Sequence, residues 1–462
     1  MSRPMVHVVH CVDSEGPLYE SLEATFDRLR HYFHLELEPD PELLRRLQQG
    51  RVDLGGLEAA VQKVLDPQLL AYNDTWDKVD AMLERVCAPD FRRRPPLDSR
   101  GRGWVFNWFC VDHVEYELNP RRRDMGYHNV FDHYRPLLRR PGWERDGLHF
   151  HYHPQPFRKQ AHLCATHWFA TSHSLFQVLA RRIIDRLWFP AVNRPGFQVN
   201  RPDSHWFLEQ YIPFDYASLA MEPRPEDQAQ FDFSHGRSGD WRRAPITWEP
   251  YHPSHDDYQV PGGCRRWIAR CLNLGSRIYN LEPEEVRRAF REARQGKAVV
   301  MAFADHDFRD LGRDVEAART MLRQAAAEYP EVELRYCEAA EAMRSALGLS
   351  ETPPCELELE LVRVSDEAHQ LHVRTHTPPF GPQPFLAIKT VTDTYHHDNL
   401  DFQEPGRHWT YVFDRETLPL KAVEAVGVAA NNAFGVTTVS VLRVDTGRVE
   451  RRVWNRPRKD EA

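Results

Sequence analysis

With 462 residues, the chain is too long for one typical domain, and two or three domains are expected. Hydrophobic residues make up 41% and charged residues 28%, a balance typical of globular rather than disordered or membrane proteins. The net charge of −8 gives no reason to expect nucleic acid as a partner. The short basic runs at 92–94 and 121–123 favour solvated loops over a phosphate-binding groove.

The sequence lacks an apolar run of about 18 residues, so no membrane span is expected. An apolar segment begins at Val6, which leaves no room for a signal peptide before it. The eight cysteines form no Cys-x-x-Cys pair and are expected to be reduced, buried thiols. Together these features predict a cytoplasmic protein.

Predicted strands and helices alternate through the first three quarters of the sequence. Helices are expected within 18–100 and at 127–140, 172–187, 206–211, 282–294 and 314–329. Short apolar runs predict strands at 5–12, 104–111, 148–152, 197–199, 214–218, 298–303 and 332–336. Such alternation is typical of an α/β barrel or a parallel sheet, and we predict one such domain over 1–350, with a helical insertion at about 18–100.

The pattern changes after the pair Pro353-Pro354. Residues 356–361 alternate with period two, and 409–413 and 437–442 also favour strands, so 355–455 is predicted to be a β-sandwich and 456–462 a disordered tail. Its expected core includes Leu359, Leu361, Phe413 and Val439. Aromatic and amide side chains in this region suit sugar rings, but Trp409 alternates with Tyr411 and Phe413, which favours a core position.

Two acidic residues, Asp13 and Glu15, follow the first predicted strand. Sites in parallel α/β folds form at the carboxyl ends of the strands, which is where this pair lies. Acidic residues after a strand are also common as helix caps or solvated turns, so the pair alone is weak evidence.

Three histidines, His149, His151 and His153, alternate along the predicted strand at 148–152. If the strand stays extended, all three lie on one face, and if the chain turns after His149, the pair at i and i+4 can converge. Imidazole is a preferred zinc ligand, so these histidines indicate a metal site more than a polar strand end.

A further histidine, His306, lies between Asp305 and Asp307 after another apolar strand. Carboxylates on both sides orient an imidazole and keep it basic, which suits proton transfer. A capped loop histidine is the equally weighted alternative.

These motifs, in this order, resemble the polysaccharide deacetylase superfamily (carbohydrate esterase family 4). The resemblance covers about residues 5–345, and its motifs correspond to Val12–Gly16, Val105–Val111, Asp146–His153, Phe197–Val199 with Trp206–Ser218, Trp248–Ser254 with Val260-Pro261, and Phe303–Phe308. Two positions depart from the family pattern. The acidic pair is Asp-x-Glu rather than adjacent, and Gln198 stands at the third-motif arginine, with Arg194 and Arg201 nearby.

The resemblance implies a distorted (β/α) barrel that binds a divalent metal, often Zn²⁺. It assigns metal binding to Glu15, His149 and His153, the general base to Asp13 and the general acid to His306. His151 would be a third imidazole ligand or an outer hydrogen-bonding partner, and Tyr251 or a nearby backbone N–H would help to hold the oxyanion. Asp305 and Asp307 would support His306 or contact the substrate.

The expected function is removal of an acyl group, N-acetyl, from a sugar used in surface-polysaccharide biosynthesis. The same machinery would suit a deformylase or an O-acetyl esterase acting on a lipid-linked or nucleotide-linked sugar. A different class of function is a catalytically inactive carbohydrate-binding relative, in which the β-sandwich binds the sugar.

Overall fold

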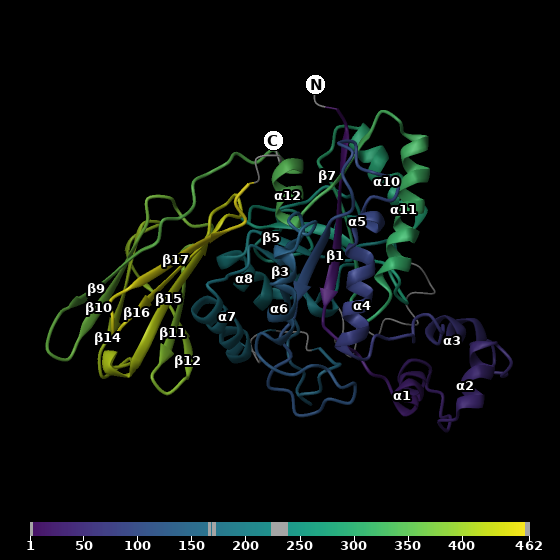
Figure 1. The fold of residues 1–462 in the computed structure, drawn as a ribbon, viewed down its shortest axis with the longest axis horizontal. Helices are drawn as coiled ribbons and strands as arrows, with labels where there is room; N and C mark the ends of the chain where they lie inside the picture. Colours follow the sequence, from purple (N-terminus) through teal and green to yellow (C-terminus); the bar gives the residue numbers. More distant parts are fainter. Residues whose placement is uncertain (1–2, 165–167, 169–171, 223–238, 458–462) are drawn as a thin grey trace.

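The computed structural model describes residues 3–164, 168, 172–222 and 239–457 (Figure 1). The predicted tail at 456–462 lies outside the described residues from position 458 onward. None of the described helices combines the length and apolar character that crossing a membrane requires.

Seven parallel strands close into a barrel, which confirms the predicted fold class. The first half of the longest strand, β1, pairs with an eighth strand, β8, and its second half pairs with β2, which closes the ring. The eight strands are β1 (Met5–Ser14), β2 (Phe106–Cys110), β3 (Gly147–Tyr152), β4 (Val192–Pro195), β5 (Phe214–Ser218), β6 (Trp267–Asn273), β7 (Val299–His306) and β8 (Glu333–Tyr336).

The lower part of the barrel interior is a packed apolar core. Alternate residues of the strands point inward, among them Val9, Cys11, Phe109, Tyr216 and Ala302, and all of these are fully buried. Apolar runs with many valines form these strands because both faces of a parallel sheet are covered. Towards the carboxyl ends of the strands, where the site lies, the inward-facing side chains are polar instead of apolar.

One predicted strand, at 197–199, is wrong. Residues Gly196–Gln198 form a 3₁₀ turn, in which Phe197 and Gln198 both have φ of 51°, a left-handed conformation that no strand adopts. The strand in this part of the barrel is β4, which ends just before the turn. The sequence predicts neither β4 nor β6.

Helices cover the outside of the barrel, and an insertion of helices lies between β1 and β2 (Figure 1). The outer helices include α6 (Asn129–Tyr134), α7 (Ser172–Arg186), α8 (Pro202–Tyr211), α10 (Pro283–Arg294), α11 (Leu311–Glu328) and α12 (Ala339–Leu347). The insertion contains α1 (Leu22–Phe33), α2 (Pro41–Gln48), α3 (Glu58–Val64), α4 (Trp76–Cys87) and α5 (Pro89–Arg92). Its first three helices share a small apolar cluster and lie beyond the carboxyl end of β1, on the side of the site.

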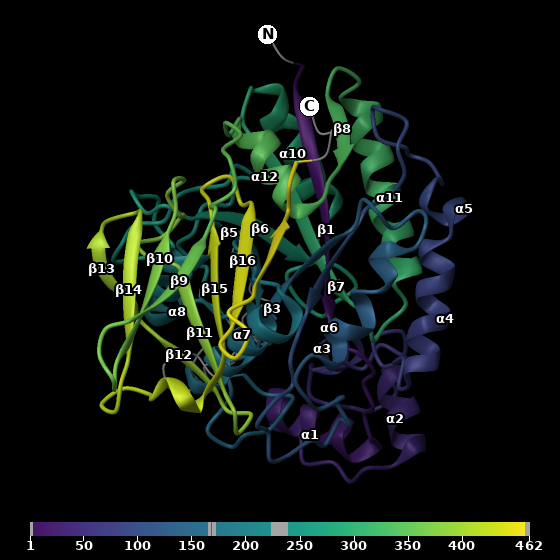
Figure 2. The same cartoon turned by 60° about the vertical axis from the view of Figure 1, so that its left-hand side comes forward.

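The C-terminal part consists of two antiparallel sheets packed face to face (Figure 2). One sheet has the order β13-β14-β10-β9 and the other β12-β11-β15-β16-β17. Their strands are β9 (Glu358–Arg363), β10 (His369–Arg374), β11 (Phe385–Thr390), β12 (Tyr395–Asp398), β13 (Asp401–Glu404), β14 (His408–Phe413), β15 (Val423–Asn431), β16 (Thr437–Arg443) and β17 (Val449–Trp454).

The core between these sheets contains Trp409 and Phe413, with Leu359 and Leu361 partly buried against it. Trp409 is therefore a core residue, which removes it as an exposed platform for a sugar ring. The prediction of Val439 in this core is wrong. Val439 lies on the other face of the five-stranded sheet. That face packs on α7 and belongs to the main apolar cluster of the barrel. The sheet is buried on both faces, so the domain boundaries at 350 and 355 stay predictions.

Candidate metal centre

The turn after β1 carries Glu15, and Asp307 from the end of β7 fixes this turn. The Asp307 carboxylate accepts hydrogen bonds from the backbone N–H groups of Glu15 (3.0 Å) and Gly16 (2.9 Å), and from the Tyr134 hydroxyl (2.8 Å). Burial outweighs these donors and raises the pKa of Asp307 to about 7. Gly16 has φ of 70°, and a Cβ there would lie 2.8 Å from Trp76, so the turn requires glycine. Asp307 thus positions Glu15.

Three buried side chains, Glu15, His151 and His153, bring one potential ligand atom each to a common point. His153 Nε2 lies 2.9 Å from His151 Nε2 and 3.3 Å from Glu15 Oε1, and His151 Nε2 lies 3.6 Å from Glu15 Oε1. Ligands about 2.0–2.1 Å from a tetrahedral zinc ion are about 3.3 Å apart, so the three atoms have the spacing of such a site.

Both imidazoles turn Nε2 towards this common point. His151 Nδ1 lies 2.6 Å from the Arg194 carbonyl oxygen, which can only accept, so Nδ1 carries a proton and, in the neutral ring, Nε2 presents a lone pair. Gly196 leaves room for the ring of His153, because a Cβ there would lie 2.3 Å from His153 Cδ2. A lone pair, a second imidazole nitrogen and a carboxylate oxygen that converge in a buried site fit a divalent cation.

The carboxylate of Glu15 is ionised in this site. Burial alone would raise its pKa, but the charge of Arg123 and the neighbouring imidazoles outweigh burial and hold the pKa well below its usual range. Arg123 Nη2 lies 2.6 Å from Glu15 Oε2, which leaves Oε1 to face His151 and His153. The donor set is therefore one carboxylate and two imidazoles, as in hydrolytic zinc sites.

His149, which the resemblance assigns to the metal, lies elsewhere. Its Nε2 atom is 3.0 Å from Glu338 Oε1 and 3.1 Å from Asn107 Oδ1, one layer deeper in the barrel than His151. The strand stays extended to Tyr152, so His149 and His151 lie on one face at successive depths, and His153 follows directly after the strand. The structure brings His153 together with His151, the alternative third ligand, and not with His149.

Asp13 and His306, the predicted base and acid, lie beside the three ligand atoms. They are paired in register on β1 and β7, and Asp13 Oδ2 lies 3.7 Å from His306 Nε2. Asp13 Oδ1 accepts a hydrogen bond from Arg194 Nε at 2.7 Å. Burial would raise the pKa of Asp13, but the charges of Arg194, His151 and His306 outweigh burial and lower it. Burial lowers the pKa of His306 to about 4, against the charges of the two acidic residues.

The guanidinium next to Asp13 comes from Arg194, although the family pattern places an arginine at position 198. Arg194 is fully buried, and Gln198 contacts its Nη2 atom at 2.7 Å. Asp13 therefore has a buried arginine partner despite the glutamine in the motif.

Two other predicted site residues lie outside the site. The Tyr251 hydroxyl donates to the Tyr258 carbonyl oxygen at 2.8 Å and packs in a separate apolar cluster. Asp305 faces the opposite side of β7 from His306 and lies 2.9 Å from His10 Nε2. Neither lines the pocket that contains Glu15, so the oxyanion role of Tyr251 has no support in the geometry.

A pocket of about 200 Å³ opens onto the ligand atoms. Its lining includes Asp13, Glu15, His151, His153 and His306, and also four arginines that the sequence analysis does not assign to the site: Arg121, Arg123, Arg277 and Arg309. The basic run at 121–123 was interpreted as a solvated loop, and that interpretation is wrong for Arg123, which is only 8% exposed and paired with Glu15. Arg92 is buried as well, in an ion pair with Asp146 at 2.6 Å.

Neither a comparison with protein-family models nor a comparison with curated proteins finds a match to this chain. The barrel and its buried Glu15, His151 and His153 group rest on the structure itself, and they indicate a metal-dependent enzyme.

Proposed function

We propose that the protein is a metal-dependent hydrolase of the polysaccharide deacetylase type, which removes an acyl group, N-acetyl, from a sugar. One observation carries the proposal. Three ligand atoms 2.9–3.6 Å apart converge at the carboxyl end of a parallel barrel, with Asp13 and His306 in the same pocket. This set of metal ligands next to a carboxylate and an imidazole matches the requirements of amide hydrolysis.

Glu15, His151 and His153 would hold a divalent cation such as Zn²⁺, which supplies the Lewis acidity that acidifies water and polarises an acyl carbonyl. The hydrogen bond from Arg194 goes to Asp13 Oδ1, and Asp13 Oδ2 would accept the proton of the attacking water. Arg194 holds the other oxygen and keeps the Asp13 carboxylate ionised.

His306 Nε2 would deliver a proton to the leaving nitrogen. With a pKa lowered to about 4 by burial, its imidazole is neutral near pH 7 and has to gain that proton during the reaction. The separation of 3.7 Å from Asp13 Oδ2 gives a short route for this transfer. The side chain is also 24% exposed, so a leaving group that enters from the pocket can reach it.

The test combines metal analysis with a substrate screen. The purified full-length protein is analysed for metal by mass spectrometry and then incubated with N-acetylated, N-formylated and O-acetylated sugars, free or linked to a nucleotide or lipid carrier. Acetate release from an N-acetyl sugar, abolished in Asp13→Asn while metal stays bound, is the expected result. Release of formate alone, or of acetate from esters alone, would replace the deacetylase by one of the related acyl hydrolases. Bound sugar without turnover of any compound would favour the inactive binding protein.

A further inference from the structure

The pocket next to the ligand atoms is strongly basic. Its described lining contains four arginines and two carboxylates, and both carboxylates already have an arginine partner. Asp13 pairs with Arg194, which lies behind the pocket, and Glu15 pairs with Arg123. Any positive charge contributed by a bound metal ion would add to this excess.

Two of these arginines, Arg277 and Arg309, form no ion pair with a carboxylate among the described residues. Arg277 Nε donates to the Val64 carbonyl oxygen at 3.0 Å, and Arg309 Nη1 donates to the Gly275 carbonyl oxygen at 3.3 Å. Arg277 Nη2 and Arg309 Nε are buried atoms that have no hydrogen-bond partner among the residues that the structure describes. Both side chains are half-buried, and buried donor atoms that lack a partner are costly, which suits a negatively charged group that arrives with a ligand.

The remaining pocket arginines also have unused donors. Arg123 is 8% exposed, and within the described part of the chain its Nε and Nη1 atoms lack a partner, as does Nε of Arg121. Arg121 shares Glu20 with Arg28, so one carboxylate serves two guanidinium groups. Burial is the main reason that the pKa of Arg277 is lowered, and the charges of Arg28 and Arg309 lower it further, against the opposing effect of Tyr72.

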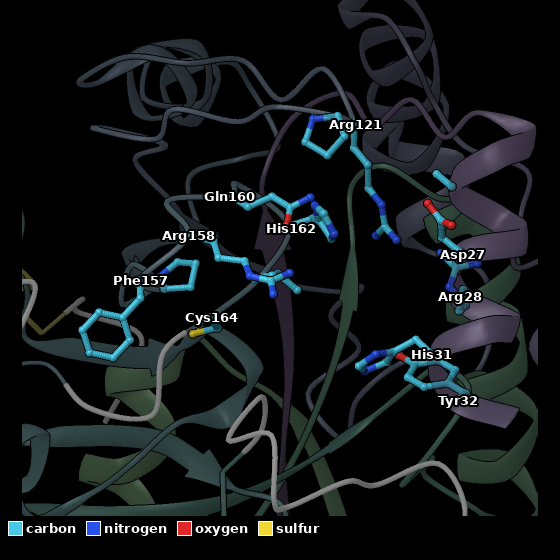
Figure 3. A pocket seen from close by; sticks show the side chains of 14 residues that line it. Asp27, Arg28, His31, Tyr32, Arg121, Phe157, Arg158, Gln160, His162 and Cys164 are labelled. Carbon is cyan, nitrogen blue, oxygen red and sulfur yellow. The ribbon is translucent and has the colours of Figure 1, made fainter. Parts of the chain in front are cut away.

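An outer pocket of about 640 Å³ lies next to this one, and Arg121 and His162 line both. Figure 3 shows Arg121 and Arg158 reaching into it, with Arg28 and Tyr32 of α1 on one wall and the loop at 156–164 on the other. Arginine side chains therefore line both pockets, from the ligand atoms outwards.

We propose that the acyl sugar carries an anionic group, phosphoryl or carboxylate, and that Arg121, Arg277 and Arg309 bind this group while the acyl carbonyl reaches Glu15, His151 and His153. The forked guanidinium matches both kinds of oxyanion, so the pocket chemistry is shared between a sugar phosphate, a sugar diphosphate carrier and a uronic acid. This proposal rests on the proposed acyl-hydrolase function for its reaction, but its anion-binding part can be tested alone.

The binding test uses inorganic pyrophosphate and the full-length, metal-loaded protein in isothermal titration calorimetry. Arg277→Gln and Arg309→Gln should each raise the dissociation constant about tenfold or more, because each removes a charge-assisted hydrogen-bond partner. Arg277→Lys and Arg309→Lys keep the charge without the fork and should lie between the wild type and the glutamine variants. The control is Arg363→Gln, which removes an arginine with a 64% exposed side chain in the C-terminal sheets and should bind as the wild type does. Unchanged affinity in the Arg277 and Arg309 variants would mean that pyrophosphate binds elsewhere, such as on the metal, and would overturn the proposal.

The activity test compares N-acetylglucosamine, its 1-phosphate and an N-acetylated uronic acid. The anionic sugars should have a kcat/KM at least about tenfold above that of the neutral sugar, because their KM is lower. The glutamine variants should lose this preference. Preference for the phosphate over the uronic acid, or the reverse, identifies the anion. Equal turnover of neutral and anionic sugars would refute the proposed anion site but not the proposed hydrolase function. Pyrophosphate binding that depends on the arginines, without release of any acyl group, would support the anion site and refute the hydrolase function.

Discussion

The histidines in and directly after β3 lie in two layers of the barrel, and the two layers differ in what their nitrogen atoms contact. In the lower layer, His149 Nε2 lies within hydrogen-bonding distance of Glu338 Oε1 and Asn107 Oδ1. In the upper layer, His151 and His153 turn Nε2 towards each other and towards Glu15, next to a pocket. Burial beside a carboxylate is common to both layers. What distinguishes the candidate metal centre is that several donor atoms converge on one point that the pocket reaches.

The largest effect expected from this difference is loss of metal. His151→Ala, His153→Ala and Glu15→Gln should each reduce the metal content from about one ion per chain to nearly none, because two ligands rarely hold zinc. His149→Gln should keep the metal, because Nε2 of His149 contacts Glu338 and does not face the ligand atoms. Mass spectrometry of the purified variants measures this directly. Metal loss in His149→Gln combined with retention in His151→Ala would reverse the assignment of the layers.

The next effect concerns proton transfer within the upper layer. Asp13→Asn and His306→Ala should each lower kcat by about 10²–10⁴-fold while the metal stays bound. Asp305→Asn is the matched control, because Asp305 is the chain neighbour of His306 but lies on the opposite face of β7 against His10. Steady-state acetate release gives the rates. Near-normal turnover in Asp13→Asn would remove Asp13 from the role of base.

The lower layer should matter for stability. His149→Ala should cost about 2 kcal/mol in the free energy of unfolding, because it takes a hydrogen-bond partner from the buried Glu338 carboxylate. Burial raises the pKa of Glu338, but His149 and the backbone donors outweigh burial and bring it to about 2, so the carboxylate is charged and needs partners. The backbone N–H groups of Ala340 and Glu341 still donate to the Glu338 carboxylate in the variant, which limits the loss of stability. Urea denaturation should show a smaller loss for His149→Gln.

The sequence predicts the shared face of the three histidines but not their depth. In the hydrogen-bonded register, Asp13 pairs with Phe109, and Phe109 pairs with His149. Barrel strands are tilted, so residues in register lie at different heights, and His151 rather than His149 reaches the level of Asp13. That offset depends on how the whole sheet closes, which no local pattern contains. The barrel itself was predictable because apolar runs alternate with helices over most of the chain.

The arginines of the pocket were beyond prediction for a related reason. Arg123, Arg277 and Arg309 come from the loops after β2, β6 and β7, which are far apart in sequence and meet only at the carboxyl ends of the strands. A basic run in a loop has the same appearance in sequence whether it faces solvent or a site. Val439 shows the same limit in the C-terminal sheets, because a period-two pattern gives two faces without saying which partner covers each one.

The smallest effect concerns His397, a packed histidine like His149 at the contact between the five-stranded sheet and α7. Its ring stacks on Phe385 at 3.9 Å and lies 4.4 Å from Phe176 of α7, and Nδ1 is 2.8 Å from the Leu386 carbonyl oxygen. Burial lowers its pKa from 6.5 to about 4, against the opposing effect of that carbonyl. Between these two pH values the unfolded chain binds a proton that the folded protein does not, so stability falls as the pH decreases from 6.5 towards 4.

His397→Gln removes this titration, so its loss of stability between pH 7 and pH 5 should be smaller than that of the wild type by about 1–2 kcal/mol. Other histidines with lowered pKa values titrate in both proteins and cancel in the difference. His255→Gln, at a position whose side chain is 78% exposed, should show the full wild-type dependence. Urea denaturation at the two pH values measures the difference. An identical pH dependence in His397→Gln and the wild type would mean that His397 is protonated as readily in the folded chain as in the unfolded one, and the contact between the sheet and α7 would then not exclude water from its ring.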